Sequence, residues 1–203
     1  PDTLYTRAAV TKMINKIIHF SDLHLRLFKE HTRYREVLTE CFIQWKEISP
    51  DRIVFTGDLV HSKNQMTPEL LEIVSWVLTE CESICPVVIL IGNHDFLENN
   101  QDRLDTLTPI IQNLNNPNIT YFKHKGCYED DNVLWCVYSL MEENERPDIP
   151  ENTEKHKIGL FHSPIEGCKT DLGFMFESGY PLEGFIGLDV VLAGDIHKRQ
   201  TFD

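Results

Sequence analysis

The spacing of hydrophobic residues changes back and forth along the first half of the chain. Short apolar runs at 17–21, 52–56 and 86–91 have the length of buried strands, whereas the stretches 34–45, 67–81 and 104–114 place apolar residues at helical spacing. Thr67 and Pro68 are typical of an N-cap and a first helical residue. Strand and helix therefore alternate, which predicts a sheet of mainly parallel strands.

The second half of the chain has a different pattern. Apolar runs at 119–122, 133–138, 157–162 and 188–193 predict strands, with little helical spacing between them. The acidic stretches 129–131 and 141–156 are expected to be loops. No change in composition marks a domain boundary. We expect a leader or extra segment at 1–12 and one α/β domain at 13–203, in which two sheets pack together with helices outside.

Composition limits the function classes. Hydrophobic residues make up 41% of the chain and charged residues 25%, an ordinary globular balance, and no apolar run is long enough to span a membrane. A net charge of −13 argues against a broad basic nucleic-acid-binding surface, although bound divalent cations could offset it locally. Six cysteines without scaffold spacing suggest a reducing compartment, the cytoplasm or the nucleus. Cys81 and Cys85 could form half a metal site but read more simply as thiols.

Polar residues of the same few types follow five of the predicted strands. They are Asp22 and His24; Asp58 and His61; Asn93, His94 and Asp95; His162; and Asp195 and His197. Any one of them could be an ordinary turn residue or a structural histidine. Because the carboxyl ends of parallel strands gather at one edge, all five together would crowd carboxylates and imidazoles, which is costly without cations. Mixed oxygen and nitrogen ligands suit Mn, Fe or Zn better than Ca or Mg.

The spacing of these residues suggests how two cations could be held. Asp22 and His24 project to the same side of an extended segment and could hold one ion, whereas Asp58 could bridge two and Asn93 offers a carbonyl oxygen. Two ions about 3.5–4 Å apart can bind a phosphate ester and offset charge during in-line displacement. A histidine paired with a carboxylate, as His94 with Asp95, could stabilise the transition state or protonate the leaving oxygen.

The ordered set of motifs resembles the calcineurin-like metallophosphoesterase superfamily. The motifs are SDLH (21–24), GDLVH (57–61), GNHD (92–95), His162 and GDIH (194–197). The resemblance implies an α/β four-layer sandwich of two mixed β-sheets flanked by helices, and two divalent ions, most simply Mn with Fe or Zn as alternatives. It also implies the ligand sets, which are Asp22, His24, Asp58 and His197 for the first metal and Asp58, Asn93 and His162 for the second.

A narrower resemblance lies in GDLVHSKN (57–64), HSPIEG (162–167) and the segment 185–200, which are similar to the SbcD-type DNA double-strand-break nucleases. This branch implies a Mn-dependent nuclease in DNA end processing or repair, a second catalytic histidine at His61 and an SMC-like ATPase partner. A loop histidine is the alternative for His61, and a homodimer is left open. Lys63, Lys198 and Arg199 lie beside motifs and could contact phosphates or be solvated surface residues.

Two features depart from the superfamily pattern. Position 195 is Asp where a histidine ligand of the second metal is usual, so we expect Asp195 to bind metal and to leave the site less attractive to phosphate. The sequence also ends soon after the last motif, and we expect this domain to lack a C-terminal capping domain. Endonuclease or exonuclease preference and polarity stay open.

Two other functions fit the same residues. The first keeps two metals but acts on a cyclic nucleotide, a small phosphodiester or a phosphoprotein, which suits the acidic composition. The second is a degenerate, non-catalytic module that binds an ATPase partner or DNA ends, with Asp195 as a sign of decay.

Overall fold

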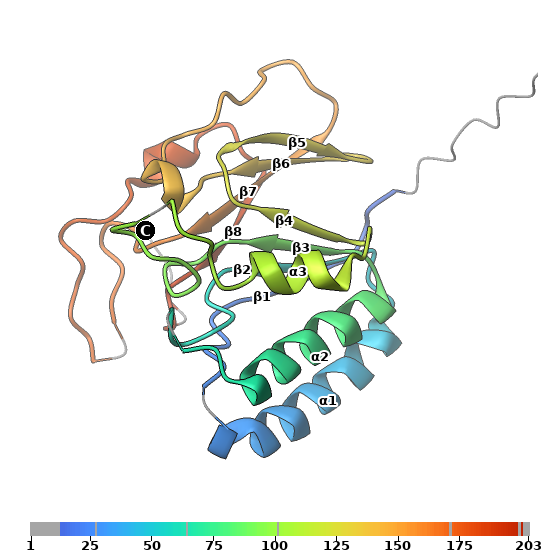
Figure 1. Cartoon of the computed structure of the whole chain (residues 1–203). Coiled ribbons are helices and arrows are strands. Elements are labelled where there is room, and N and C mark those ends of the chain that lie inside the picture. The colour runs from blue at the N-terminus through green and yellow to red at the C-terminus, as the bar shows by residue number, and fades with distance from the viewer. Residues whose placement is uncertain are drawn as a thin grey trace, which may run out of the picture.

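The computed structural model describes residues 13–26, 28–63, 65–100, 102–170, 172–198 and residue 200. The expected leader at 1–12 and Arg199 lie outside these residues. Eight strands within them form two sheets of four strands each, with orders β1-β2-β3-β4 and β5-β6-β7-β8 (Figure 1).

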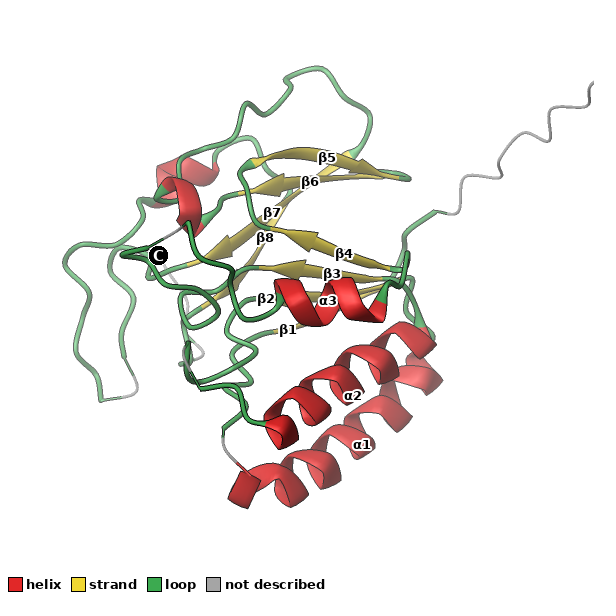
Figure 2. Cartoon of the chain, in the orientation of Figure 1, coloured by secondary structure: helices red, strands yellow, loops and turns green. Residues whose placement is uncertain are grey.

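The first sheet is parallel throughout. Its strands are β1 (Ile17–Phe20), β2 (Arg52–Thr56), β3 (Val87–Leu90) and β4 (Ile119–Phe122), and each pairs in parallel with its neighbour. The connections carry η1 (Phe28–Glu30) with α1 (His31–Ile48), then α2 (Pro68–Ile84) and then α3 (Thr108–Leu114). Figure 2 shows the three α-helices along one side of this sheet. The predicted alternation of strand and helix is therefore confirmed.

The second sheet is mixed. Its strands are β5 (Gly126–Asp130), β6 (Val133–Val137), β7 (His156–His162) and β8 (Val190–Gly194); β5 is antiparallel to β6, and the remaining pairs are parallel. Two short 3-10 helices, η2 (Leu140–Glu142) and η3 (Leu182–Phe185), lie in the connections. The predicted two-sheet α/β architecture is confirmed, with α-helices on the outer face of the first sheet and loops with η2 and η3 beside the second (Figure 1). Two mixed sheets were expected, but among the described strands only the second sheet is mixed.

Three apolar layers hold these elements together, and one of them, which contains Tyr138 and Phe161, covers the outer face of the second sheet. Val54, Leu90, Trp135 and Leu160 belong to the layer between the two sheets, where each is 1% exposed or less. A second layer joins the outer face of the first sheet to α1, α2 and α3. Buried apolar side chains at alternate strand positions thus face one layer or the other, which explains why β2 and β3 read as continuous apolar runs.

Two local predictions were wrong. The acidic stretch 129–131 was expected to be a loop, but Glu129 and Asp130 end strand β5. The third helix begins at Thr108 rather than near Leu104, which is 72% exposed. Asp105 explains that later start, because its Oδ1 accepts a hydrogen bond from the Thr108 amide at 2.7 Å in the manner of a cap. The N-cap at Thr67 is confirmed, since its side chain accepts from the Leu70 amide.

The parallel strands bring distant segments to one edge of the molecule. The carboxyl ends of β1, β2 and β3 point the same way as those of β7 and β8 (Figure 1). At that edge the ring of His162 from β7 meets the carbonyl of Thr56 from β2. Among the described residues, no helix combines the length and apolarity needed to cross a membrane.

Candidate metal centre

The loops that leave these strands carry strained backbone. Asp22, His24, Asp58 and Asp195 all have positive φ, at 56°, 45°, 61° and 70°. Residues other than glycine rarely adopt this backbone conformation, and such strain concentrates at functional sites. Main-chain hydrogen bonds stabilise it, because the Asp22 amide donates to Gly57 O at 3.1 Å and the His24 amide to Asp58 O at 3.0 Å.

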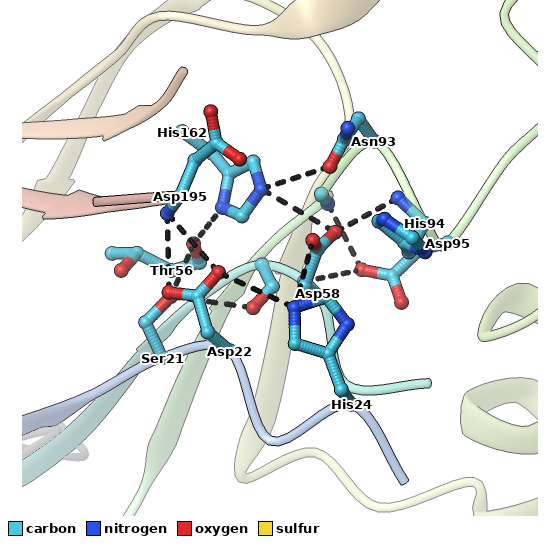
Figure 3. A network of polar contacts seen from close by, with 12 residues as sticks. Ser21, Asp22, His24, Thr56, Asp58, Asn93, His94, Asp95, His162 and Asp195 are labelled. Atoms are coloured by element: carbon cyan, nitrogen blue, oxygen red, sulfur yellow. Dashed lines mark hydrogen bonds and ion pairs between the residues drawn. The ribbon is translucent and has the colours of Figure 1, made fainter. Parts of the chain in front are cut away.

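Asp58 lies at the middle of a cluster of carboxylates and imidazoles (Figure 3). Its side chain is 1% exposed, with Oδ1 3.3 Å from His162 Nε2 and Oδ2 3.6 Å from His24 Nε2. Asp22 continues the cluster, since its Oδ1 lies 3.9 Å from His24 Nε2 and 3.5 Å from His197 Nε2. The five side chains come from four strand ends far apart in the sequence.

The ring of His162 is fixed in orientation. Its Nδ1 lies 2.5 Å from the carbonyl oxygen of Thr56, so Nδ1 carries the proton and donates it. The other ring nitrogen, Nε2, then faces Asn93 Oδ1 at 3.2 Å and Asp58. A backbone acceptor on one ring nitrogen is the usual arrangement for a histidine that binds metal through the other.

Glycines leave the room that this packing needs. A Cβ on Gly92 would lie 2.2 Å from the Asp58 amide nitrogen and 2.3 Å from its Oδ1. A Cβ on Gly57, whose φ is +94°, would lie 2.4 Å from His162 Nδ1, and one on Gly194 would lie 2.2 Å from Thr56 O. The glycines of the GD and GN motifs therefore permit close approach of four strand ends, those of β2, β3, β7 and β8.

Asp95 supports the loop that carries Asp58. It is fully buried, and its Oδ2 accepts from the amides of Asp58 and Gly92 at 3.0 and 2.9 Å, while Oδ1 accepts from the Val60 amide. Burial, together with the charge of Asp58, raises the pKa of Asp95 to about 7. Asp95 thus positions the backbone around Asp58.

His94 and His61 form a pair beside the cluster. Their rings stack with centroids 5.5 Å apart, and His94 Nδ1 lies 2.7 Å from the main-chain carbonyl oxygen of His61. The expected pairing of His94 with the Asp95 carboxylate is therefore wrong, because both Asp95 oxygens are occupied by backbone amides. The His94 amide donates instead to Asp58 Oδ1 at 2.8 Å.

Charge in the cluster is balanced by protons when no cation is bound. Burial alone would lower the pKa of His162, but the Asp58 carboxylate raises it to about 9. Burial would likewise raise the pKa of Asp58, yet the hydrogen bond and charge of His162 hold it below its usual range. A divalent cation would take the place of the proton that these two residues share.

The donor sets fit divalent metal ions. Two groups each place one ligand atom per residue within 4.8 Å of one another, namely Asp22, Asp58 and His162, and Asp22, His24 and His197. Both mix carboxylate oxygen with imidazole nitrogen, which suits Mn, Fe or Zn. Asn93 stands beside the first group. The side chains that the sequence motifs supplied are therefore close enough to share two ions, although their individual ligand roles stay predictions.

Asp195 differs from the other aspartates. Its amide donates to both oxygens of the Asp22 carboxylate at 3.1 Å, and burial raises the pKa of its own carboxyl. The Asp195 carboxylate joins none of the close ligand groups among the described residues, and Figure 3 shows it directed away from Asp22. Its expected role as a metal ligand stays a prediction.

Of the three basic residues near the motifs, the structure describes Lys63 and Lys198. Lys63 is held by Glu98, with Nζ 2.5 Å from the Glu98 carboxylate. Lys198 follows His197, and its carbonyl accepts from the Gln200 side chain. Arg199 lies outside the described residues. No cysteine belongs to a candidate ligand group in the described part of the chain, so Cys81 and Cys85 gain no support as a metal site.

Sequence reasoning missed two residues that position the site. Thr56 supplies the carbonyl that orients His162, and Ser21 Oγ donates to the same carbonyl at 2.9 Å. Both stand immediately before the motif residues, Ser21 before Asp22 and Thr56 before Gly57. Their positions in SDLH and TGD were the available signal.

Comparison with known proteins agrees with this geometry. The sequence model of the calcineurin-like phosphoesterase family matches residues 15–199. The chain belongs to this family. The match covers all the strand ends described above, and the family explains why carboxylates and histidines converge on one edge: calcineurin-like phosphoesterases are metal-dependent hydrolases.

Two curated relatives match nearly all of the chain. The chain is 36% identical to the uncharacterized protein R555 of Acanthamoeba polyphaga mimivirus over 201 residues, which are 92% of the chain and 15% of that protein. The chain is 23% identical to the DNA double-strand break repair protein Mre11 of Methanococcus maripaludis over 198 residues, which are 91% of the chain and 52% of that protein. The chain thus spans 15% of one relative and about half of the other.

Proposed function

We propose that this calcineurin-like phosphoesterase is a Mn-dependent phosphodiesterase that cleaves DNA, in end processing or repair. The observation that carries the proposal is the stacked pair of His61 and His94 beside the carboxylate–imidazole cluster. Both rings lie beside the candidate ligand His24, with centroids 5.5 Å away for His61 and 4.8 Å away for His94, so both would be near a phosphate bound at the cluster. The similarity to a protein named for DNA double-strand break repair supports the same substrate class.

We assign the metal ligands and the proton donor to the following residues of the chain. Asp22, His24, Asp58 and His197 would hold one ion, and Asp58, Asn93 and His162 the other, with Asp195 as a further candidate ligand. When bound, two divalent ions polarise the phosphate and lower the pKa of water. The hydrogen bond to His61 O occupies Nδ1 of His94 and leaves Nε2, which could take up a proton and then give it to the leaving oxygen. His61 could orient the DNA strand.

The test is a digestion assay with purified full chain on linear duplex and single-stranded DNA, with Mn²⁺ and with EDTA. We expect Mn-dependent cleavage that His94→Gln and His61→Gln each reduce at least about 100-fold. His124→Gln is the matched control, because its side chain is 65% exposed and binds Glu142. Failure to cleave either DNA with any of Mn, Fe or Zn would overturn the proposal.

A second candidate function is hydrolysis of a smaller phosphoester. The net charge of −13 favours it, because a chain so acidic repels a long polyanion outside the metal centre. A panel containing bis-p-nitrophenyl phosphate, a cyclic nucleotide and a phosphopeptide separates the two. Cleavage of a panel member without cleavage of DNA would favour this alternative, whereas metal binding without any cleavage would favour a non-catalytic module.

Assembly belongs to the same proposal. The similarity of GDLVHSKN (57–64) to SbcD-type nucleases supports an SMC-like ATPase partner, and a homodimer is left open. The six cysteines without scaffold spacing support a reducing compartment, the cytoplasm or the nucleus. Light scattering of the purified chain measures the homodimer directly. Co-purification with an ATPase encoded in the same genome tests the partner, and recovery of the chain alone would argue against it.

A further inference from the structure

Three histidines form a group that contains no carboxylate. One ring nitrogen from each of His24, His61 and His94 lies within 4.8 Å of one from each of the others. The ring centroids of His24 and His94 are 4.8 Å apart, and both other pairs are 5.5 Å apart. Only His24 also belongs to one of the two carboxylate-containing groups.

Two nitrogens in this group have no hydrogen-bond partner. His24 Nδ1 and His61 Nδ1 are buried and unpaired, and among the described side chains only Asn144 Oδ1 shares that condition. His24 already faces Asp58 and Asp22 through Nε2, so the unpaired atom is its other ring nitrogen. His162 and His94 differ, since a carbonyl oxygen partners the Nδ1 of each. Unpaired buried nitrogens destabilise a protein unless something binds them.

The chemistry of three imidazoles selects a particular class of cation. Imidazole nitrogen suits Zn, Cu and Ni, whereas Mn prefers sites richer in oxygen. Zn²⁺ binds histidine nitrogen at about 2.0–2.1 Å, so the three rings would move together by on the order of 1 Å. The charge of Arg26 acts on His61 and disfavours a cation there, but Arg26 is exposed to solvent, which screens it. The Asp58 carboxylate, 3.6 Å from His24 Nε2 and 1% exposed, adds favourable charge.

We propose that His24, His61 and His94 form an imidazole-only site for Zn²⁺, separate in its ligands from the carboxylate-containing centre except at His24. The proposal rests on the proposed function, because a Zn²⁺ ion there would occupy the two histidines assigned to the substrate. The site would make the enzyme sensitive to inhibition by excess Zn²⁺ while Mn²⁺ supports activity.

The test measures Zn²⁺ binding to the metal-free full chain by competition with a chromogenic chelator. His61→Ala removes a ligand of the imidazole-only site and no ligand of the carboxylate-containing groups. We expect it to weaken one class of Zn²⁺ binding at least about 10-fold. Asp22→Asn should retain that class, because Asp22 belongs only to the carboxylate-containing groups. His124→Ala, an exposed histidine elsewhere, should bind Zn²⁺ as the wild type does.

Equal Zn²⁺ binding by wild type and His61→Ala would overturn the proposal, as would loss of all Zn²⁺ binding in Asp22→Asn. Circular dichroism confirms that each variant is folded. Should one not fold, ring-nitrogen NMR of the wild type replaces it: Zn²⁺ should shift the signals of His24, His61 and His94 first, and shifts confined to His162 and His197 would contradict the proposal. Because the readout is binding, its failure differs from absence of DNA cleavage with Mn²⁺, which would overturn the proposed function instead.

Discussion

His94 Nδ1 lies 2.7 Å from the main-chain carbonyl oxygen of His61. This contact joins the loop after β2 to the loop after β3, and it requires a proton on Nδ1 because a carbonyl can only accept. The ring is thereby fixed with Nε2 as its free nitrogen. One backbone oxygen thus sets both the tautomer and the direction of a candidate catalytic side chain.

Replacing His94 by asparagine should separate the hydrogen bond made by Nδ1 from the chemistry of Nε2. The asparagine amide nitrogen can take the place of Nδ1 and donate to His61 O, but no atom replaces Nε2. Under the proposed function we expect DNA cleavage to fall about 10²–10⁴-fold. The free energy of unfolding should stay within about 0.5 kcal/mol of the wild type, whereas His94→Ala should lose about 1 kcal/mol with the hydrogen bond. Urea unfolding and steady-state rates measure both, and wild-type cleavage by His94→Asn would exclude His94 from catalysis.

Asp58→Asn should remove metal binding without disturbing the fold. Asparagine has the same shape and keeps one carbonyl oxygen, but it supplies neither the negative charge nor the second anionic oxygen that now face His162 and His24. We expect Mn²⁺ affinity to fall on the order of 100-fold or more, measured by calorimetry or by electron paramagnetic resonance. Glu154→Gln is the matched control, because Glu154 is exposed beyond the opposite end of β7. Equal Mn²⁺ affinity in both variants would argue against the centre.

The sequence predicted which residues would gather at the site because a general rule on parallel strands applied to it. Parallel strands direct their carboxyl ends to the same edge, so Asp22, Asp58 and Asn93 could be expected to converge before any coordinate was known. The rule says nothing of which atoms pair, and the backbone partner of His94 and the orientation of Asp195 could not be predicted. Main-chain oxygens carry no sequence signal.

Strand β5 shows the same limit in the fold. Its sequence, GCYED, has too few apolar residues to predict a strand, because β5 is an edge strand and only partly buried. Its acidic end is explained by partners far along the chain: Asp130 binds Arg52, and Glu129 lies 3.2 Å from Lys155. Ion pairs between residues so far apart along the chain are visible only in the folded structure.

Gly92→Ala should disturb the centre through the backbone. The added Cβ would lie 2.2 Å from the Asp58 amide nitrogen and 2.3 Å from Asp58 Oδ1, so the Asp58 loop must shift. We expect a loss of about 1–3 kcal/mol in the free energy of unfolding, as for overpacking elsewhere, together with weaker Mn²⁺ binding.

Gly173→Ala provides the comparison for Gly92→Ala. A Cβ on Gly173 meets no atom within 4 Å, although its φ of +85° makes alanine strained. The Gly173→Ala variant should lose about 1 kcal/mol in the free energy of unfolding and bind Mn²⁺ as the wild type does. Thermal unfolding and calorimetry measure the two effects, and unchanged Mn²⁺ affinity in Gly92→Ala would show that Asp58 can move without consequence.

The ion pair between Arg52 and Asp130 should make stability depend on pH. Arg52 at the start of β2 donates from Nε and from a terminal nitrogen to the two Asp130 oxygens at 2.8 and 2.5 Å, and so joins the two sheets. Burial alone would raise the pKa of Asp130, but hydrogen bonds from Arg52 and Trp135 hold it below the usual range. A carboxyl with a lowered pKa stabilises the fold above its unfolded pKa of about 3.9, and this contribution is lost as pH falls through the folded pKa.

Asp130→Asn should therefore cost about 2 kcal/mol at pH 7, a value typical of charge-assisted hydrogen bonds with side chains that are 10% and 24% exposed. The difference from wild type should be constant above roughly pH 5 and shrink below roughly pH 4, because protonation then removes the charge from the wild type as well. Glu80→Gln breaks the more exposed pair with Lys46 and should cost under about 0.5 kcal/mol at any pH. Urea unfolding between pH 2.5 and 7 measures both variants. A difference for Asp130→Asn that persists undiminished at pH 2.5 would mean that packing of the Asp130 side chain, rather than its charge, joins the two sheets.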